Sequence, residues 1–239
     1  LGILKSKINY SKIFISKKSF KISKLLSKKS KKIVVYKDNQ KILNESDWIF
    51  LALTPTVGNK IIKDLDFKKT HLIISFISTI KMKDLKKLIK VKAKIVRAIP
   101  LPPISLKKGP VPIFPPNRMV KDFFNKIGNT IEISKENLSL NFWTTSSIMA
   151  PFYGILYHLS SWLVKKGIKK NDAQNYITSL FLALAKDANI KSNDLKKLVN
   201  ESQTPKGLNE QSLKELKKRG FYNSLHKTLE VILKRLNKK

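Results

Sequence analysis

The sequence contains no cysteine, which excludes disulfide bonds and thiolate metal sites. It also has no uninterrupted apolar run near the roughly 18 residues that a membrane span requires. The first residues lack the order of charged, apolar and small residues that is typical of a signal peptide. We therefore expect a cytoplasmic protein without a membrane partner.

Acidic residues and arginine are scarce. Lysine and arginine together number 49, against 16 aspartate and glutamate residues, which gives a formal charge of +33. The arginines are Arg97, Arg118, Arg219 and Arg235, and the other basic residues are lysines scattered among many Ile and Asn residues. Base readout and bidentate phosphate contacts favour arginine, so the imbalance indicates an AT-rich coding bias. We expect no specific nucleic-acid partner, only weak nonspecific binding at low salt.

The first part of the chain alternates short apolar runs with amphipathic, lysine-rich segments. With 239 residues, 42% of them hydrophobic, the chain can form one large or two ordinary globular domains. The expected strands are Ile13–Ser16, Ile33–Tyr36, Trp48–Leu53, Leu72–Ile77, Ile95–Ile99, Val111–Phe114 and Thr130–Ile133. The expected helices are Phe20–Lys28, Asn39–Glu45, Val57–Leu65, Met82–Ile89 and Arg118–Ile127. This alternation predicts an α/β domain with a largely parallel, doubly wound sheet.

Ligands bind such sheets at the carboxyl ends of the strands, where small, polar and proline residues gather in this sequence. Turn chemistry alone could explain these residues. Lys17 and Lys18, which follow the first run, could instead bind a ribose 2′-phosphate, and this would favour NADP over NAD.

After Ser134 the pattern changes to long helical segments. We expect helices at Asn137–Lys165, Asn171–Asn189, Ser192–Asn200, Leu208–Lys218 and Phe221–Leu236, with Gly167 as a C-cap and Asn171 as an N-cap. The first helix carries apolar residues from Phe142 to Leu163 over too broad a surface for one neighbour. This surface suits a helical core or a subunit interface.

The turn from Thr204 to Gly207 leads into the predicted helix Leu208–Lys218. A helix N-terminus carries free backbone N–H groups and a partial positive charge, so it can hold a carboxylate or a phosphate. An ordinary helix start is the alternative.

Five motifs, in order and at compatible separations, resemble the pyrroline-5-carboxylate reductase family from the first residues to the last helix. The family's D-x-V-x-L-A-V-K-P corresponds to Asp47–Pro55, I-S-I-A-A-G-I to Ile74–Ile80, and R-x-M-P-N-T-P to Arg97–Pro103. T-A-L-S-G-S-G-P-A-Y corresponds to Thr144–Tyr153, which keeps Thr144, Ser147, Pro151 and Tyr153, and S-P-G-G-T-T corresponds to Thr204–Asn209.

The resemblance implies a Rossmann-type sheet that lacks its first strand, followed by an all-α dimerisation domain. It implies that residues 1–134 bind a dinucleotide and that residues 135–239 bind the substrate and a second subunit, with an active site shared in a homodimer or higher homo-oligomer. The expected NADP-binding residues, with the two strand-end lysines, are Lys17, Lys18, Asn39, Ala52, Leu53, Thr54, Pro55, Ser75, Ser78 and Pro100. The expected substrate-binding residues are Ser147, Thr204, Lys206, Gly207 and Leu208, with Asn209 as the catalytic residue and no metal ion.

The sequence departs from the family pattern in several places. It holds no G-x-G-x-x-G loop, which the family would place before Leu1, where no initiator methionine stands. We therefore expect a truncated or fragmentary chain that is inactive by itself, and whether the segment is truly lost stays open. Thr54 replaces a lysine, Leu101 an asparagine, and Asn209 a threonine that hydrogen-bonds the substrate nitrogen. Ile148 and Ala150 replace two glycines.

The expected function is NADPH-dependent reduction of a cyclic imine with a carboxylate, with pyrroline-5-carboxylate and proline as first choice. Hydride transfer to a C=N carbon needs alignment more than an acid/base pair, and His71, His158 and His226 are expected to be structural or solvent-facing. The alternatives are reduction of a related imine or carbonyl, and a noncatalytic metabolite-binding relative. The related hydroxyacid dehydrogenase family ranks second, because its general acid is a lysine within a helix, whereas Lys165 and Lys166 lie at the end of their helix. A basic nucleic-acid-binding protein is the third choice.

Overall fold

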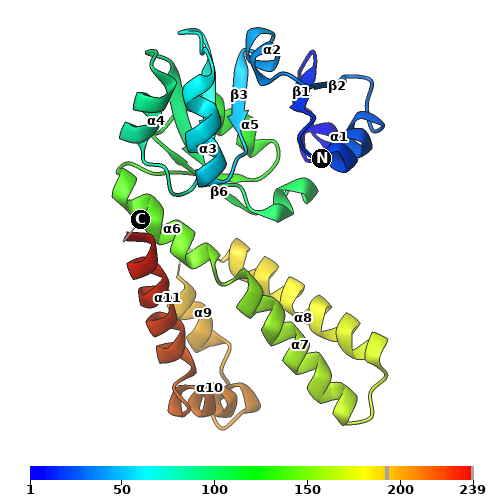
Figure 1. Ribbon diagram of the computed structural model, residues 1–239. Helices are drawn as coiled ribbons and strands as arrows, with labels where there is room; N and C mark the ends of the chain where they lie inside the picture. The colour runs from blue at the N-terminus through cyan, green and yellow to red at the C-terminus, as the bar shows by residue number, and fades with distance from the viewer. Residues whose placement is uncertain (192–193, 238–239) are drawn as a thin grey trace. The chain divides into compact units, whose positions relative to one another are not determined.

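A computed structural model describes residues 1–191 and 194–237 of the chain. The described residues form two compact units, one up to residue 143 and one from residue 144 onward (Figure 1). The predicted division of function, with a dinucleotide-binding part up to residue 134 and a substrate-binding part after it, stays a prediction.

The first unit is an α/β structure with a mainly parallel arrangement of strands. β1 (Ile13–Ser16) and β2 (Ile33–Tyr36) form a parallel pair. A five-stranded sheet follows in the order β3 (Trp48–Leu51), β4 (Leu72–Ser75), β5 (Lys94–Ala98), β6 (Pro110–Phe114) and β7 (Asn129–Glu132). All of its pairs are parallel except β5–β6, which is antiparallel. The predicted α/β class and parallel sheet are confirmed.

Helices connect these strands. They are η1 (Ile3–Lys5), α1 (Phe20–Ser27), α2 (Asn39–Asn44), α3 (Pro55–Ile61), η2 (Ile62–Asp64), α4 (Met82–Ile89), η3 (Pro102–Leu106) and α5 (Arg118–Asn125). β3 and β4 each end two residues before their predicted ends, so the residues that follow them belong to the loops at the carboxyl edge of the sheet.

The strand β4 shows how the sheet is covered. All four of its residues are buried, and alternate side chains join different cores, because successive residues of a strand point to opposite faces. Ile73 packs with Ile62 and with Leu85 of α4, whereas Ile74 packs with Val120 and Phe124 of α5. Helices therefore cover both faces, as in a doubly wound sheet, which explains why β4 is a continuous apolar run.

The second unit is helical. The division between the units falls within α6 (Glu136–Ser146), and α7 (Met149–Lys165), α8 (Lys170–Ile190), α9 (Leu195–Glu201), α10 (Leu208–Lys218) and α11 (Phe221–Asn237) follow. α7 and α8 lie side by side as a hairpin (Figure 1). In the turn between them Gly167 has φ of 94°, and the N–H groups of Gly167 and Ile168 donate to the carbonyls of Val164 and Leu163 at 3.0 and 3.1 Å. This is a Schellman-type helix end, which requires the left-handed conformation that glycine tolerates.

The predicted single helix Asn137–Lys165 is wrong, because the structure divides it into α6 and α7 at Ser147 and Ile148. Pro151 lies in the first turn of α7 and has no N–H to donate to the carbonyl of Ser147, so a continuous helix cannot pass this point without losing a hydrogen bond. The hydroxyl of Ser147 instead turns back and donates to the carbonyl of Thr144 at 2.6 Å.

Two helix starts in this unit also differ from the sequence prediction. The N-cap of α8 is Lys169 and not Asn171, because the helix begins one residue before Asn171. α9 begins at Leu195, with the carboxylate of Asp194 accepting the N–H of Lys197 at 2.9 Å. The predicted start of that helix at Ser192 lies outside the described residues. In the part of the chain that the structure describes, no helix has the length and apolar character to cross a membrane.

Candidate cofactor and substrate sites

A cavity of about 620 Å³ lies between the edges of β1 and β3. Its walls include Ile13 to Ser16 from β1 and Ile49 to Leu53 from β3 and the loop after it. Within the described residues β1 pairs only with β2, and β3 only with β4, so the cavity separates the two sheets. A second cavity of about 420 Å³ is lined by the starts of the same two strands.

Half of the residues predicted to bind NADP line the larger cavity. They are Lys18, Asn39, Ala52, Leu53 and Pro100. These residues come from four separate connections along the chain and meet where β1, β2, β3 and β5 end, the edge at which doubly wound sheets bind ligands. Lys17, Thr54, Pro55, Ser75 and Ser78 are not among the residues lining this cavity.

The cavity fits a dinucleotide in part. Phe14, Phe50 and Phe76 supply flat apolar walls, while Ser16, Lys18 and Asn39 supply polar groups at the strand ends. Asn39 begins α2, whose N-cap Asp38 accepts the N–H of Gln40 at 2.8 Å. Among the described residues lining this cavity, however, the only glycine is Gly2, so they provide no glycine-rich turn against which a pyrophosphate could lie.

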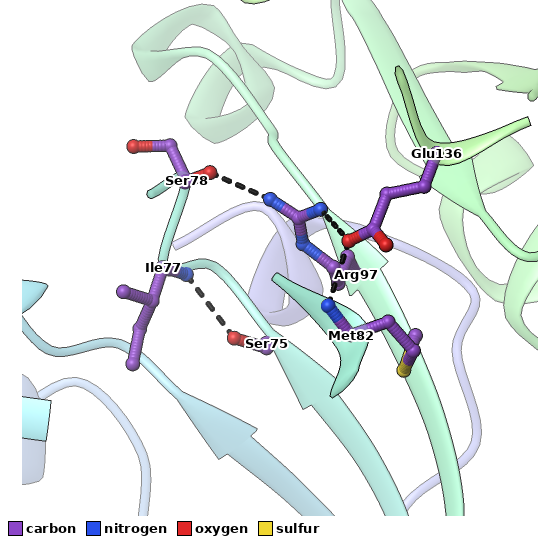
Figure 2. Close-up of polar contacts among 6 residues, drawn as sticks. All are labelled: Ser75, Ile77, Ser78, Met82, Arg97 and Glu136. Carbon is purple, nitrogen blue, oxygen red and sulfur yellow. Dashed lines mark hydrogen bonds and ion pairs between the residues drawn. The ribbon is translucent and has the colours of Figure 1, made fainter. Parts of the chain in front are cut away.

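The loop after β4 is held by hydrogen bonds at the same edge of the sheet (Figure 2). The buried Ser75 hydroxyl accepts the N–H of Ile77 at 3.3 Å, and the carbonyl of Ser78 accepts a hydrogen bond from Arg97 at 2.6 Å. Ser75 and Ser78 therefore shape this loop through contacts within the protein. Phe76, between them, is the loop residue that reaches the cavity.

Arg97, in β5, has 2% of its side chain exposed and forms an ion pair with Glu136, the first residue of α6 (Figure 2). Burial lowers the pKa of Arg97, while the charge and hydrogen bond of Glu136 oppose that shift. Its guanidinium carbon also lies 4.4 Å from the centre of the Trp143 ring. The sequence motif identified Arg97 only as the first residue of Arg97–Pro103, and it did not indicate Glu136 as the partner of this arginine. The available signal was an arginine inside an apolar strand of a lysine-rich chain, because a buried charge needs a partner.

The predicted substrate residues lie in the helical unit. Gly207 is the N-cap of α10, and its N–H donates to the carbonyl of Thr204 at 2.8 Å. Lys206 has φ of 61°, and its N–H donates to the carboxylate of Glu210 at 2.7 Å. A hydrogen bond from Lys214, together with the one from Lys206, lowers the pKa of Glu210. The carboxylate bound at this turn is therefore that of Glu210, a residue of the same chain.

Asn209, predicted as the catalytic residue, donates from its side-chain amide to the carbonyl of Ser202 at 3.0 Å. Leu208 is 84% exposed. Neither cavity described above is lined by residues of this turn or by Ser147. The cofactor and substrate residues thus lie in different units, and their roles stay predictions.

Residues 137–239 match a family model described as pyrroline-5-carboxylate reductase dimerisation. No curated protein matches the chain. Among solved structures, the pyrroline-5-carboxylate reductase of Streptococcus pyogenes is 20% identical, with a TM-score of 0.82 over 100% of this chain and 94% of that one. The Plasmodium falciparum enzyme, solved with NADP bound, is 20% identical, with a TM-score of 0.83 over 98% and 90%. That of Coxiella burnetii is 21% identical, with a TM-score of 0.82 over 99% and 92%. At these identities the likeness shows the fold.

Proposed function

We propose that the chain is a member of the pyrroline-5-carboxylate reductase family and acts as an NAD(P)H-dependent oxidoreductase that reduces the C=N bond of a small cyclic imine. The first candidate substrate is pyrroline-5-carboxylate, and the product is then proline. The observation that carries the proposal is the match of residues 137–239 to the family's dimerisation model. It is supported by an α/β unit in which half of the predicted cofactor residues line one cavity.

Reduction of a C=N bond depends little on acid or base side chains. A reduced nicotinamide, when bound, supplies the hydride for the C=N carbon, and the protein must mainly align the imine and exclude water. We assign the walls of the larger cavity to cofactor binding, with Asn39 and Lys18 at the ribose end and Pro100 near the carboxyl end of β5. The N–H groups at the start of α10 would hold the substrate carboxylate, and Asn209 would orient the reacting nitrogen.

We propose that NADPH is preferred to NADH, through Lys18. Lys18 lines the cavity, whereas the ammonium group of Lys17 lies 5.4 Å from the centre of the Phe20 ring. A charged contact to the 2′-phosphate contributes about 1.5 to 3 kcal/mol. Lys18→Ala should therefore weaken NADPH binding by about tenfold or more and leave NADH binding unchanged. Lys17→Ala is the matched control and should change NADPH binding less.

The test is an assay of reduced-nicotinamide consumption by the full-length protein with pyrroline-5-carboxylate and a series of related cyclic imines that carry a carboxylate. Consumption with at least one of them, faster with NADPH, is the expected result. Equal or tighter binding of NADH would discard the role of Lys18, and no turnover with any imine would discard the reductase.

A metabolite-binding relative without catalysis is the second candidate. The turn predicted to hold the substrate carboxylate binds the chain's own Glu210 through the N–H of Lys206, and this favours it. Such a protein would bind the imine or its product without turnover.

A further inference from the structure

Arg97 is the only buried lysine or arginine among residues 1–191 and 194–237, although the chain is dominated by basic residues. Burying a charge is costly unless it is paired and hydrogen-bonded. The buried charge of Arg97 therefore requires specific hydrogen-bonding and charged partners, which a solvent-exposed lysine does not need.

The hydrogen-bond partners of Arg97 come from two other segments, the loop after β4 and α6 (Figure 2). One terminal nitrogen of the guanidinium, Nη1, is paired with Glu136 Oε1 of α6, and the other, Nη2, donates to the carbonyl of Ser78 at 2.6 Å. Glu136 Oε1 also accepts the N–H of Met82, the first residue of α4, at 2.7 Å. This N–H belongs to the first turn of the helix, where backbone donors lack partners within the helix.

The Arg97–Glu136 pair therefore holds the loop between β4 and α4 at two points, within the loop and at the start of α4. Ser78 is held directly by Arg97, and Met82 is held through Glu136. Phe76 of the same loop lines the larger cavity and packs against Phe50 and Phe124, with ring centres 5.8 and 6.4 Å apart. The position of this cavity wall thus depends on a loop that the ion pair holds.

Two directed contacts from one group require the planar fork of arginine. A lysine ammonium is a single point charge on a flexible stem, so it could pair with Glu136 without keeping the bond to Ser78 in the same geometry. The Trp143 ring, 4.4 Å from the guanidinium carbon, further restricts the plane of the group.

We propose that Arg97 and Glu136 are positioning residues that hold the loop of residues 76–81 in the conformation that forms the wall of the proposed cofactor cavity. That the loop affects cofactor binding rests on the proposed function. That the ion pair orders the loop is independent of the proposed function.

The first test measures amide hydrogen exchange of the full-length protein without nucleotide. Arg97→Lys and Glu136→Gln should speed exchange in residues 76–85 by about tenfold or more, because each removes a charged hydrogen bond that holds the loop. Glu132→Gln is a matched control, because Glu132 pairs with Lys121 at 2.6 Å and its side chain is 29% exposed, as is that of Glu136. The control should leave exchange in residues 76–85 unchanged.

The second test separates positioning from general stability. Glu136→Gln alone leaves the buried charge of Arg97 without its counterion, whereas Arg97→Met with Glu136→Gln removes both charges. The double variant should therefore melt at a higher temperature than Glu136→Gln. Its loop should still exchange fast, and NADPH should still bind about tenfold or more weakly than to the parent protein.

The outcomes distinguish the inference from the proposed function. If the double variant regains slow exchange in residues 76–85 together with its melting temperature, the pair acts only through stability and the inference is wrong. Unchanged exchange in Arg97→Lys and Glu136→Gln would overturn it equally. Fast exchange in the variants, with no NADPH binding even by the parent, would support loop positioning and count against the proposed cofactor.

Discussion

At the scale of single residues, His71 makes the stability of the α/β unit depend on pH. It lies before β4 with 2% of its surface exposed, and its Nδ1 accepts the N–H of Lys68 at 3.1 Å. A backbone hydrogen-bond interaction with Leu43 and the charge of Asp47 favour the protonated ring. Burial, followed by the charge of Lys68, lowers the pKa of His71 below its ordinary value of 6.5. The folded protein therefore favours the neutral imidazole more than the unfolded chain does.

The sign of the effect follows from linkage. Well above pH 6.5 the imidazole is neutral in both states, and the full stability is present. As the pH falls below 6.5 the unfolded state binds a proton first, so stability is lost until the lower, folded-state pKa is passed. The slope for one proton is at most about 1.4 kcal/mol per pH unit.

His71→Gln should therefore give a melting temperature that falls less between about pH 7.5 and about pH 5.5 than that of the parent protein. The comparison is thermal melting across this range, with the exposed His158→Gln as control. If His71→Gln and His158→Gln have the same pH dependence as the parent, His71 is not the group responsible.

At the scale of elements, the turn of residues 204–207 packs closely against the start of α10, which leaves little space for a side chain at residue 207. A Cβ added at Gly207 would lie 2.9 Å from the carbonyl oxygen of Thr204 and 3.2 Å from its Cβ. Any side chain at residue 207 must therefore move the backbone. Asn209 secures the same turn to the end of α9 through the carbonyl of Ser202. The geometry of the N–H groups at the helix start depends on both residues.

If this helix start holds the substrate carboxylate, Gly207→Val should raise KM and lower kcat/KM, because the turn and its N–H groups are displaced. Asn209→Ala should mainly lower kcat, at a cost of about 1 to 3 kcal/mol, because it removes a hydrogen bond that orients the reacting atom. Asn209→Thr restores the usual family residue and should raise activity on pyrroline-5-carboxylate relative to Asn209→Ala.

The measurement is steady-state kinetics of the full-length enzyme, with melting temperature recorded for each variant. Gln211→Ala, at an exposed position of α10, is the control and should keep the parent kinetics. Parent kinetics in both Gly207→Val and Asn209→Ala would mean that the turn is only a helix cap.

At the scale of the whole molecule, α7 and α8 carry more apolar surface than the described chain covers. Tyr157, Trp162, Tyr176 and Leu182 are 65%, 58%, 62% and 72% exposed. Large exposed apolar side chains suit a subunit interface, and residues 137–239 match a family model described as pyrroline-5-carboxylate reductase dimerisation. We propose a two-fold homodimer through this unit.

Light scattering at micromolar concentration should give twice the chain mass of 27.4 kDa. Leu182→Glu should shift the protein toward the monomer, because it places a charge in the interface, and should leave the fold intact because the position is exposed in one chain. Leu106→Glu, at a 65% exposed position of η3, is the control and should remain dimeric. A monomeric parent protein would contradict the interface and a shared active site.

Much of the local structure could be predicted from the sequence alone. β1, β2, α4 and α10 have the predicted bounds, because a short apolar run or an apolar face at helical spacing depends on residues near one another in the chain. The α/β order also predicted that Lys18, Asn39, Ala52 and Pro100 follow strands, so they could be placed at one edge of the sheet.

Tertiary structure decided the rest. The Arg97–Glu136 pair joins residues 39 positions apart, and no local pattern indicates which of 16 acidic residues a buried arginine will meet. The separation of β1 and β2 from the five-stranded sheet likewise depends on which strand edges pair. The burial of His71, which sets its pKa, also requires the folded core around it. Periodicity and turn chemistry act over a few residues, whereas burial and charge pairing depend on which distant segments the fold brings into contact.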